Sequence, residues 1–180
     1  IIDCKNNDIL SLLKDIDEKR TENKIDIVKD KLPKDTEEIL PLKKEELIFD
    51  NEFGGFTNNG KEYVIYKNIE NKLPAVWCNV LANKFFGSVV TDSLGGYTWY
   101  KNSRLNRLTA WNNNSIDDFP SEIYYIKDED NLHTWTLNTS VNPSKNYYYV
   151  RHGFGYSNFQ NSNNNLIQTI DVFVPNEENV

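Results

Sequence analysis

Aromatic residues are confined to one part of this 180-residue chain. Residues 1–48 contain none, and all 23 Phe, Tyr and Trp residues lie in 49–180. The first segment is also highly charged, since residues 1–50 hold 24 of the 47 charged residues. A segment of that composition cannot bury enough apolar surface to build a core. The sequence therefore predicts a charged lead-in over 1–48, followed by a folded domain over 49–180.

The lead-in contains one helical pattern. Its apolar residues recur at the spacing of one helix face, after the capping residue type Asp8, and are Ile9, Leu10, Leu12, Leu13 and Ile16. Charged residues take mostly the opposite side. We expect a short amphipathic helix that docks on a partner surface. The alternative is a frayed charged helix with no partner.

From Phe49 onward the apolar residues alternate with polar ones, as they do in strands. Turn-forming residues recur every ~8–12 residues, which is typical of an all-β sandwich or barrel. The expected strands are 49–53, 61–66, 85–91, 97–100, 122–127, 132–137, 147–151, 156–160 and 166–174, with an Asn-rich loop at 161–165. The last strand ends at Pro175, so we expect it to leave a sheet edge that can pair with another copy of the chain.

Charge and length exclude several classes of protein. The net charge of −7 repels phosphate backbones, so nucleic acid is a poor partner. No apolar run approaches the ~18–20 residues of a membrane helix, and no signal peptide is readable. The absence of Met indicates a piece of a longer protein. Two cysteines and two histidines without ligand spacing predict neither a disulfide framework nor a metal site, and favour the cytoplasm.

Motifs for covalent chemistry are also lacking in the sequence. Neither histidine accompanies a Gly-x-Ser-x-Gly elbow, and no phosphate-binding P-loop is present. Cys78 lies in an apolar stretch, where a buried structural thiol is favoured over a reactive one. Carboxylate pairs occur at 117–118 and 128–130, but both have the composition of turns in which Asp caps its own backbone. We therefore expect no catalytic residue in this chain.

Two segments combine aromatic rings with guanidinium and amide groups. The candidate binding residues are Trp99, Asn102, Arg104, Arg107 and Trp111 in the first segment, and Arg151 and His152 in the second. Aromatic faces stack on the C–H faces of sugars, and planar amides and guanidinium groups match pairs of hydroxyls. This pattern indicates a carbohydrate-facing surface. The alternative is sheet packing and a domain interface, because aromatic residues are good strand formers and Asn is abundant throughout.

Five stretches, in this order, carry a family resemblance. They are F-G-G-F-T and G-K-E-Y-V-I within 53–65, P-A-V-W-C-N-V-L-A-N at 74–83, G-G-Y-T-W and N-S-R-L-N-R-L-T-A-W within 95–111, E-I-Y-Y-I-K-D-E-D at 122–130 and R-H-G-F-G-Y at 151–156. Ala110 stands where the family often has Pro, and Lys127 where it has Arg. Together they resemble the N-terminal β-sandwich domain of glycoside hydrolase family 94, which includes cellobiose, chitobiose and β-1,2-oligoglucan phosphorylases and part of cyclic β-1,2-glucan synthases.

The resemblance implies an antiparallel β-supersandwich, similar to that of galactose mutarotase, of which this chain holds the first part. It also implies an (α/α)₆ catalytic barrel outside these residues, which would carry the general acid and bind inorganic phosphate as co-substrate. No metal or organic cofactor is implied. The implied partners are a β-glucan oligosaccharide, the missing barrel and a second copy in a homodimer.

The implied role is that of a non-catalytic domain that helps to form the carbohydrate site. The enzyme would lie in the cytoplasm, or form the cytoplasmic portion of a membrane-anchored synthase. Two alternatives remain open from the residues alone. One is a self-standing carbohydrate-binding module, and the other is a structural domain for oligomerisation.

Overall fold

The computed structural model describes residues 40–112, 114 and 116–176, which belong to one compact unit. These residues form ten β-strands and no helix, so the all-β prediction is confirmed. No helix of the length and hydropathy needed to cross a membrane occurs in this part of the chain. The predicted helix at 9–16 lies outside the described residues, and the predicted domain boundary near residue 48 stays a prediction.

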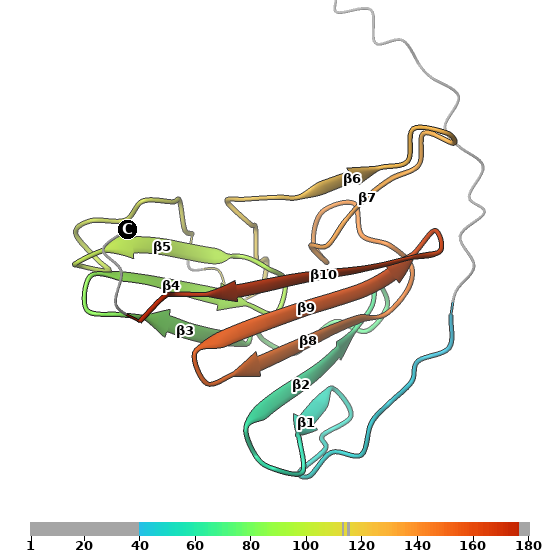
Figure 1. Ribbon diagram of the computed structural model, residues 1–180, viewed down its shortest axis with the longest axis horizontal. Coiled ribbons are helices and arrows are strands. Elements are labelled where there is room, and N and C mark those ends of the chain that lie inside the picture. The colour runs from blue at the N-terminus through green and yellow to red at the C-terminus, as the bar shows by residue number, and fades with distance from the viewer. Residues whose placement is uncertain (1–39, 113, 115, 177–180) are drawn as a thin grey trace, which may run out of the picture. The chain divides into compact units, whose positions relative to one another are not determined.

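The larger sheet has five antiparallel strands in the order β1-β2-β8-β9-β10. Their bounds are β1 (Gly54–Phe56), β2 (Glu62–Lys67), β8 (Tyr148–Gly153), β9 (Tyr156–Asn163) and β10 (Leu166–Phe173). Figure 1 shows β1 and β2 in teal beside the orange and red strands from the end of the chain. β10 is an edge strand, as expected, while its pairing with a second copy stays a prediction.

Two predicted boundaries in this sheet are wrong. Phe49 and Glu52 have φ values of 55° and 75°, which a strand cannot contain, so the first strand begins at Gly54 rather than at Phe49. The predicted loop at 161–165 is shorter, because only Asn164 and Asn165 connect β9 to β10. Both have positive φ, as a two-residue type I′ hairpin turn requires.

The smaller sheet has three antiparallel strands in the order β3-β4-β5, and a two-stranded ribbon pairs β6 with β7. Their bounds are β3 (Cys78–Ala82), β4 (Phe86–Thr91), β5 (Gly96–Tyr100), β6 (Tyr125–Lys127) and β7 (Thr134–Thr136). The sequence did not predict β3. The prediction of a buried thiol is also wrong, because Leu81 faces the core and strand alternation turns Cys78 outward, where it is exposed.

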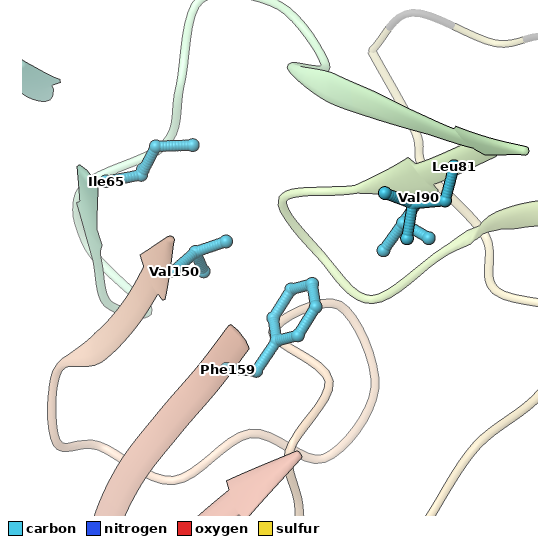
Figure 2. Close-up of a cluster of buried hydrophobic side chains, with 5 residues drawn as sticks. All are labelled: Ile65, Leu81, Val90, Val150 and Phe159. Atoms are coloured by element: carbon cyan, nitrogen blue, oxygen red, sulfur yellow. The ribbon is translucent and has the colours of Figure 1, made fainter. Parts of the chain in front are cut away.

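The core lies between the two sheets. Ile65, Val150 and Phe159 of the larger sheet point toward Leu81 and Val90 of the smaller one, as Figure 2 shows. Each of these side chains is at most 3% exposed. The amide of Asn79 on β3 joins the sheets, since its Nδ2 donates to two carbonyls at the β8–β9 turn at 2.9 Å each. Each sheet therefore has one inner and one outer face.

Candidate functional site

The outer face of the smaller sheet carries an aromatic cluster built on β5. Tyr97 and Trp99 lie on the face opposite to the core, because they pair in register with Val89 and Gly87 rather than with the buried Val90. A Cβ atom at Gly87 would lie only 2.1 Å from Cζ2 of Trp99. The indole therefore packs directly on the backbone of β4, at a position that only glycine allows.

The chain after β5 folds back over the same face. Trp99 and Arg107 form a β-bridge, and the Leu108 amide donates to the Thr98 carbonyl at 2.9 Å. This return stacks Trp111 on Tyr97, with 4.7 Å between ring centroids and an interplanar angle of 27°. We call Tyr97, Trp99, Arg107 and Trp111 the aromatic cluster.

The guanidinium of Arg107 lies over two rings of the cluster. Its Cζ is 5.0 Å from the Tyr97 centroid and 5.2 Å from the Trp111 centroid, which is within cation–π range. Its Nε donates to the Ser103 carbonyl at 3.1 Å. Within the described part of the chain no carboxylate lies at ion-pair distance from it. Its terminal N–H groups can therefore donate to an external acceptor.

The tip of the returning loop holds the other two candidates of this segment. The Oδ1 of Asn102 accepts from the amides of Arg104 at 3.0 Å and Leu105 at 2.8 Å. Asn102 thus shapes the turn through its own side chain. Arg104 is exposed and its side chain forms no hydrogen bond or ion pair among the described residues, while Leu105 and Leu108 beside it are 82% and 56% exposed.

A cavity of about 250 Å³ lies between the smaller sheet and β10 of the larger one, because its lining combines Ser88, Val90 and Thr98 with residues 170–173 of β10. Hydroxyl, carboxylate and phenol groups contribute to its lining, from Thr98, Thr109, Glu122 and Tyr124, and Tyr97 is shared with the cluster. Ligand pockets usually begin at ~300 Å³, so this cavity can hold only part of a ligand.

Arg151 and His152 lie elsewhere, on opposite faces of β8. Arg151 is on the outer face of the larger sheet, where its guanidinium pairs with Glu45 at 2.5 Å and Glu62 at 3.5 Å. His152 faces inward, where its Nδ1 is 2.9 Å from the Ser157 hydroxyl. Burial lowers the pKa of His152. The predicted residues of the second segment therefore belong neither to the aromatic cluster nor to one common site.

The carboxylate pairs behave as turn and packing groups. Asp128 accepts from the Asp130 amide at 2.9 Å, as predicted for a self-capping turn. Asp118 accepts from the Thr91 hydroxyl, and burial raises the pKa of its carboxyl. Among the described residues, no three His, Cys, Asp or Glu side chains are grouped to hold a metal ion.

The structure thus brings together Trp99, Arg107 and Trp111 but not the other predicted residues. Sequence reasoning missed Tyr97, whose ring contacts all three. Two signals in the sequence could have corrected the set. Tyr97 precedes Trp99 by two positions on one strand and so shares its face, whereas consecutive residues such as Arg151 and His152 must point to opposite faces.

Comparison with known proteins gives the family. Residues 61–180 match the model for the glycosyl hydrolase 94 supersandwich domain. The chain is 33% identical to N,N'-diacetylchitobiose phosphorylase of Vibrio furnissii and 32% identical to that of Vibrio proteolyticus. Each match extends over 129 residues, which make up 70% of this chain and 16% of the relative. It is 32% identical over 122 residues to cyclic beta-(1,2)-glucan synthase NdvB of Rhizobium meliloti (strain 1021), which is 67% of this chain and 4% of the synthase.

The matched region contains the whole aromatic cluster and all of the strands from β2 to β10. The observed two-layer antiparallel architecture agrees with a supersandwich. This chain therefore belongs to the family of glycosyl hydrolase 94 supersandwich domains.

Proposed function

We propose that this chain is a non-catalytic sandwich domain of an enzyme that acts on β-glucan oligosaccharides, and that its aromatic cluster packs at the border between a catalytic barrel and the carbohydrate site. The observation that carries the proposal is the outward orientation of Tyr97, Trp99 and Trp111 on the smaller sheet. Aromatic side chains on an outer face signal a binding surface when they gather with exposed apolar neighbours. Leu105 and Leu108 supply those neighbours.

The chemistry of the cluster suits a saccharide or a domain that holds one. Tyr97 and Trp111 hold the Arg107 guanidinium by cation–π contact, so its free N–H groups are fixed before a partner arrives. Preorganised donors of this kind match pairs of hydroxyls or a carboxylate. Arg104 at the loop tip would add a second, mobile donor.

The enzyme's chemistry would lie outside this chain. The barrel would supply the general acid and bind inorganic phosphate as co-substrate, with no metal or organic cofactor, and a second copy of the enzyme would complete a homodimer. We place the enzyme in the cytoplasm, or on the cytoplasmic side of a membrane-anchored synthase. The alternative, a self-standing carbohydrate-binding module, would use the same cluster without a barrel.

The experiment uses Trp111→Ala and Arg107→Ala in the full-length enzyme, with Tyr125→Ala as the matched control because Tyr125 is exposed on β6, outside the cluster. We expect the first two variants to raise the KM for the oligosaccharide about tenfold or to weaken attachment of the domain, and the control to do neither. The chain alone should not consume phosphate with any β-glucan. Unchanged kinetics and assembly in both variants would contradict the proposal.

A further inference from the structure

A second surface of the domain has the chemistry of a ligand site and lies apart from the aromatic cluster. It is a groove of about 530 Å³ on the outer face of the larger sheet, within the usual size range of small-molecule pockets. Its lining residues are Leu40, Pro41, Lys43, Asn146, Tyr147, Tyr149, Gln160, Ser162 and Ile167. We call this the tyrosine groove.

The floor of the groove is made of two cross-strand residue pairs of the larger sheet. Tyr149 on β8 pairs in register with Gln160 on β9, and Ser162 on β9 pairs with Ile167 on β10. Tyr147 precedes Tyr149 by two residues, so both rings lie on the same face of the sheet. In each of these pairs, an aromatic or aliphatic side chain therefore lies beside a neutral polar one.

The wall of the groove is the segment that precedes β1. Its position is fixed by hydrogen bonds to the sheet, because the Leu40 amide donates to Asn146 Oδ1 at 2.6 Å and the Lys43 amide donates to the Tyr149 hydroxyl at 3.2 Å. Tyr149 is held in turn by an edge-to-face contact with buried Tyr66, at 5.6 Å between centroids. The groove is thus formed before any ligand arrives.

Several polar groups in the groove have no hydrogen-bond partner within the described part of the chain. They are the Gln160 amide, the Ser162 hydroxyl and the Tyr147 phenol. All three side chains are half-buried, so each has lost part of its hydration. Half-buried polar groups gain most from a ligand that can both donate and accept.

The charge of the lining selects the class of ligand. Lys43 is the only charged residue among the lining residues, and its side chain is exposed. An acidic ligand would find one cation at most, and a basic ligand would find no carboxylate. A pyranose fits better, because its C–H face can stack on the tyrosine rings while its hydroxyls pair with amide and hydroxyl groups.

We infer that the tyrosine groove binds a neutral β-linked oligosaccharide, as an accessory site separate from the aromatic cluster. The inference takes its ligand class from the proposed function, and its location from the groove alone. An accessory site of this kind would hold a long glucan on the domain while another part of the chain is being processed.

The test is binding of β-1,2-linked glucotetraose, cellotetraose and N,N'-diacetylchitobiose to the whole 180-residue chain, by titration calorimetry and amide NMR shifts. We expect saturable binding to at least one of them, with shifts concentrated at Gln160, Ser162 and Ile167. Tyr147→Ala and Gln160→Leu should each weaken binding about tenfold. Tyr125→Ala is the matched control, because that tyrosine is 59% exposed and outside the groove, and it should bind like the unaltered chain.

Several results would overturn the inference. No binding of any of the three sugars at millimolar concentration would do so, and so would binding with shifts confined to residues 97–111. Binding of inorganic phosphate in place of the sugars would show an anion site instead. A Trp111→Ala chain separates this inference from the proposed function, since it should retain binding in the groove even if the aromatic cluster proves to have no role.

Discussion

The two outer faces of the sandwich use arginine in opposite ways. Arg151 on the larger sheet lies between Glu45 and Glu62, so its charge is neutralised inside the domain. Arg107 on the smaller sheet lies on two aromatic rings and has no carboxylate partner among the described residues. Residue type and neighbouring aromatic residues are therefore a poor guide to which arginine is left without a countercharge inside the domain.

The largest effect is expected from a substitution in the core, on which both sheets pack. Phe159→Ala empties a position that is 2% exposed between the sheets, and a Phe-to-Ala cavity usually costs about 3–5 kcal/mol of unfolding free energy. Chemical denaturation monitored by circular dichroism measures it. Phe154→Ala is the control, because that ring is 84% exposed and its loss should stay within about 0.5 kcal/mol. Equal losses for both variants would contradict the two-layer core.

A smaller effect is expected from a change that disturbs only the smaller sheet. In Gly87→Ala the new methyl group would overlap the Trp99 indole, so the ring must leave the backbone of β4. Overpacking of this kind costs roughly 1–3 kcal/mol. Tryptophan fluorescence should change together with stability. If fluorescence and stability both stay the same, Trp99 does not pack on β4 as described.

The different environments of Arg151 and Arg107 can be distinguished by the salt dependence of stability. Arg151→Met removes a partly exposed ion-pair network and should cost about 0.5–1 kcal/mol at low ionic strength. At 1 M salt the Debye length is about 3 Å, so most of this cost should disappear. Arg107→Met should show little dependence on salt, because the contacts of Arg107 are to rings. Parallel denaturation curves at low and high NaCl separate the two, and the same salt dependence in both variants would remove the contrast.

The smallest effect concerns the inward neighbour of Arg151. Burial lowers the pKa of His152 below its ordinary value of 6.5, so the unfolded chain binds a proton first as the pH falls. The stability that a neutral His152 maintains above pH 6.5 should therefore decline as the pH falls toward the folded pKa. His152→Asn should flatten this part of the pH–stability curve. A variant that keeps the full decline below pH 6.5 would show that another group causes it.

Much of the fold follows from local signals. Turn residues at 58–60, 94–96 and 128–131 locate three hairpins, because their backbone requirements are met by few residue types. β3 was missed because its residues Cys78 to Ala82 contain two small or thiol side chains and follow Pro74 closely, so alternation is weak there. The start of the first strand, at Gly54, was predicted too early in the sequence. Phe49 and Phe53 follow the alternating pattern of a strand, but the backbone at residues 49 and 52 has positive φ.

The candidate site was less predictable than the fold. Trp99, Arg107 and Trp111 could be predicted together because they lie in one short segment of the sequence. In the structure, the loop that returns along β5 brings them into contact. The countercharges of Arg151 could not be found in the same way, since Glu45 and Glu62 are distant in sequence. The tyrosine groove was missed for a similar reason, because its wall and its floor come from opposite ends of the described chain.

The most direct measurement compares hydrogen exchange in this chain alone with exchange in the longer enzyme to which we propose it belongs. The amides of residues 97–111 should gain protection in that longer protein, because the proposed catalytic domain would cover the aromatic cluster, while those of β8 and β9 should change little. Protection confined to the outer face of the larger sheet, with residues 97–111 exchanging equally in both, would contradict the assignment of the smaller sheet as the contact face.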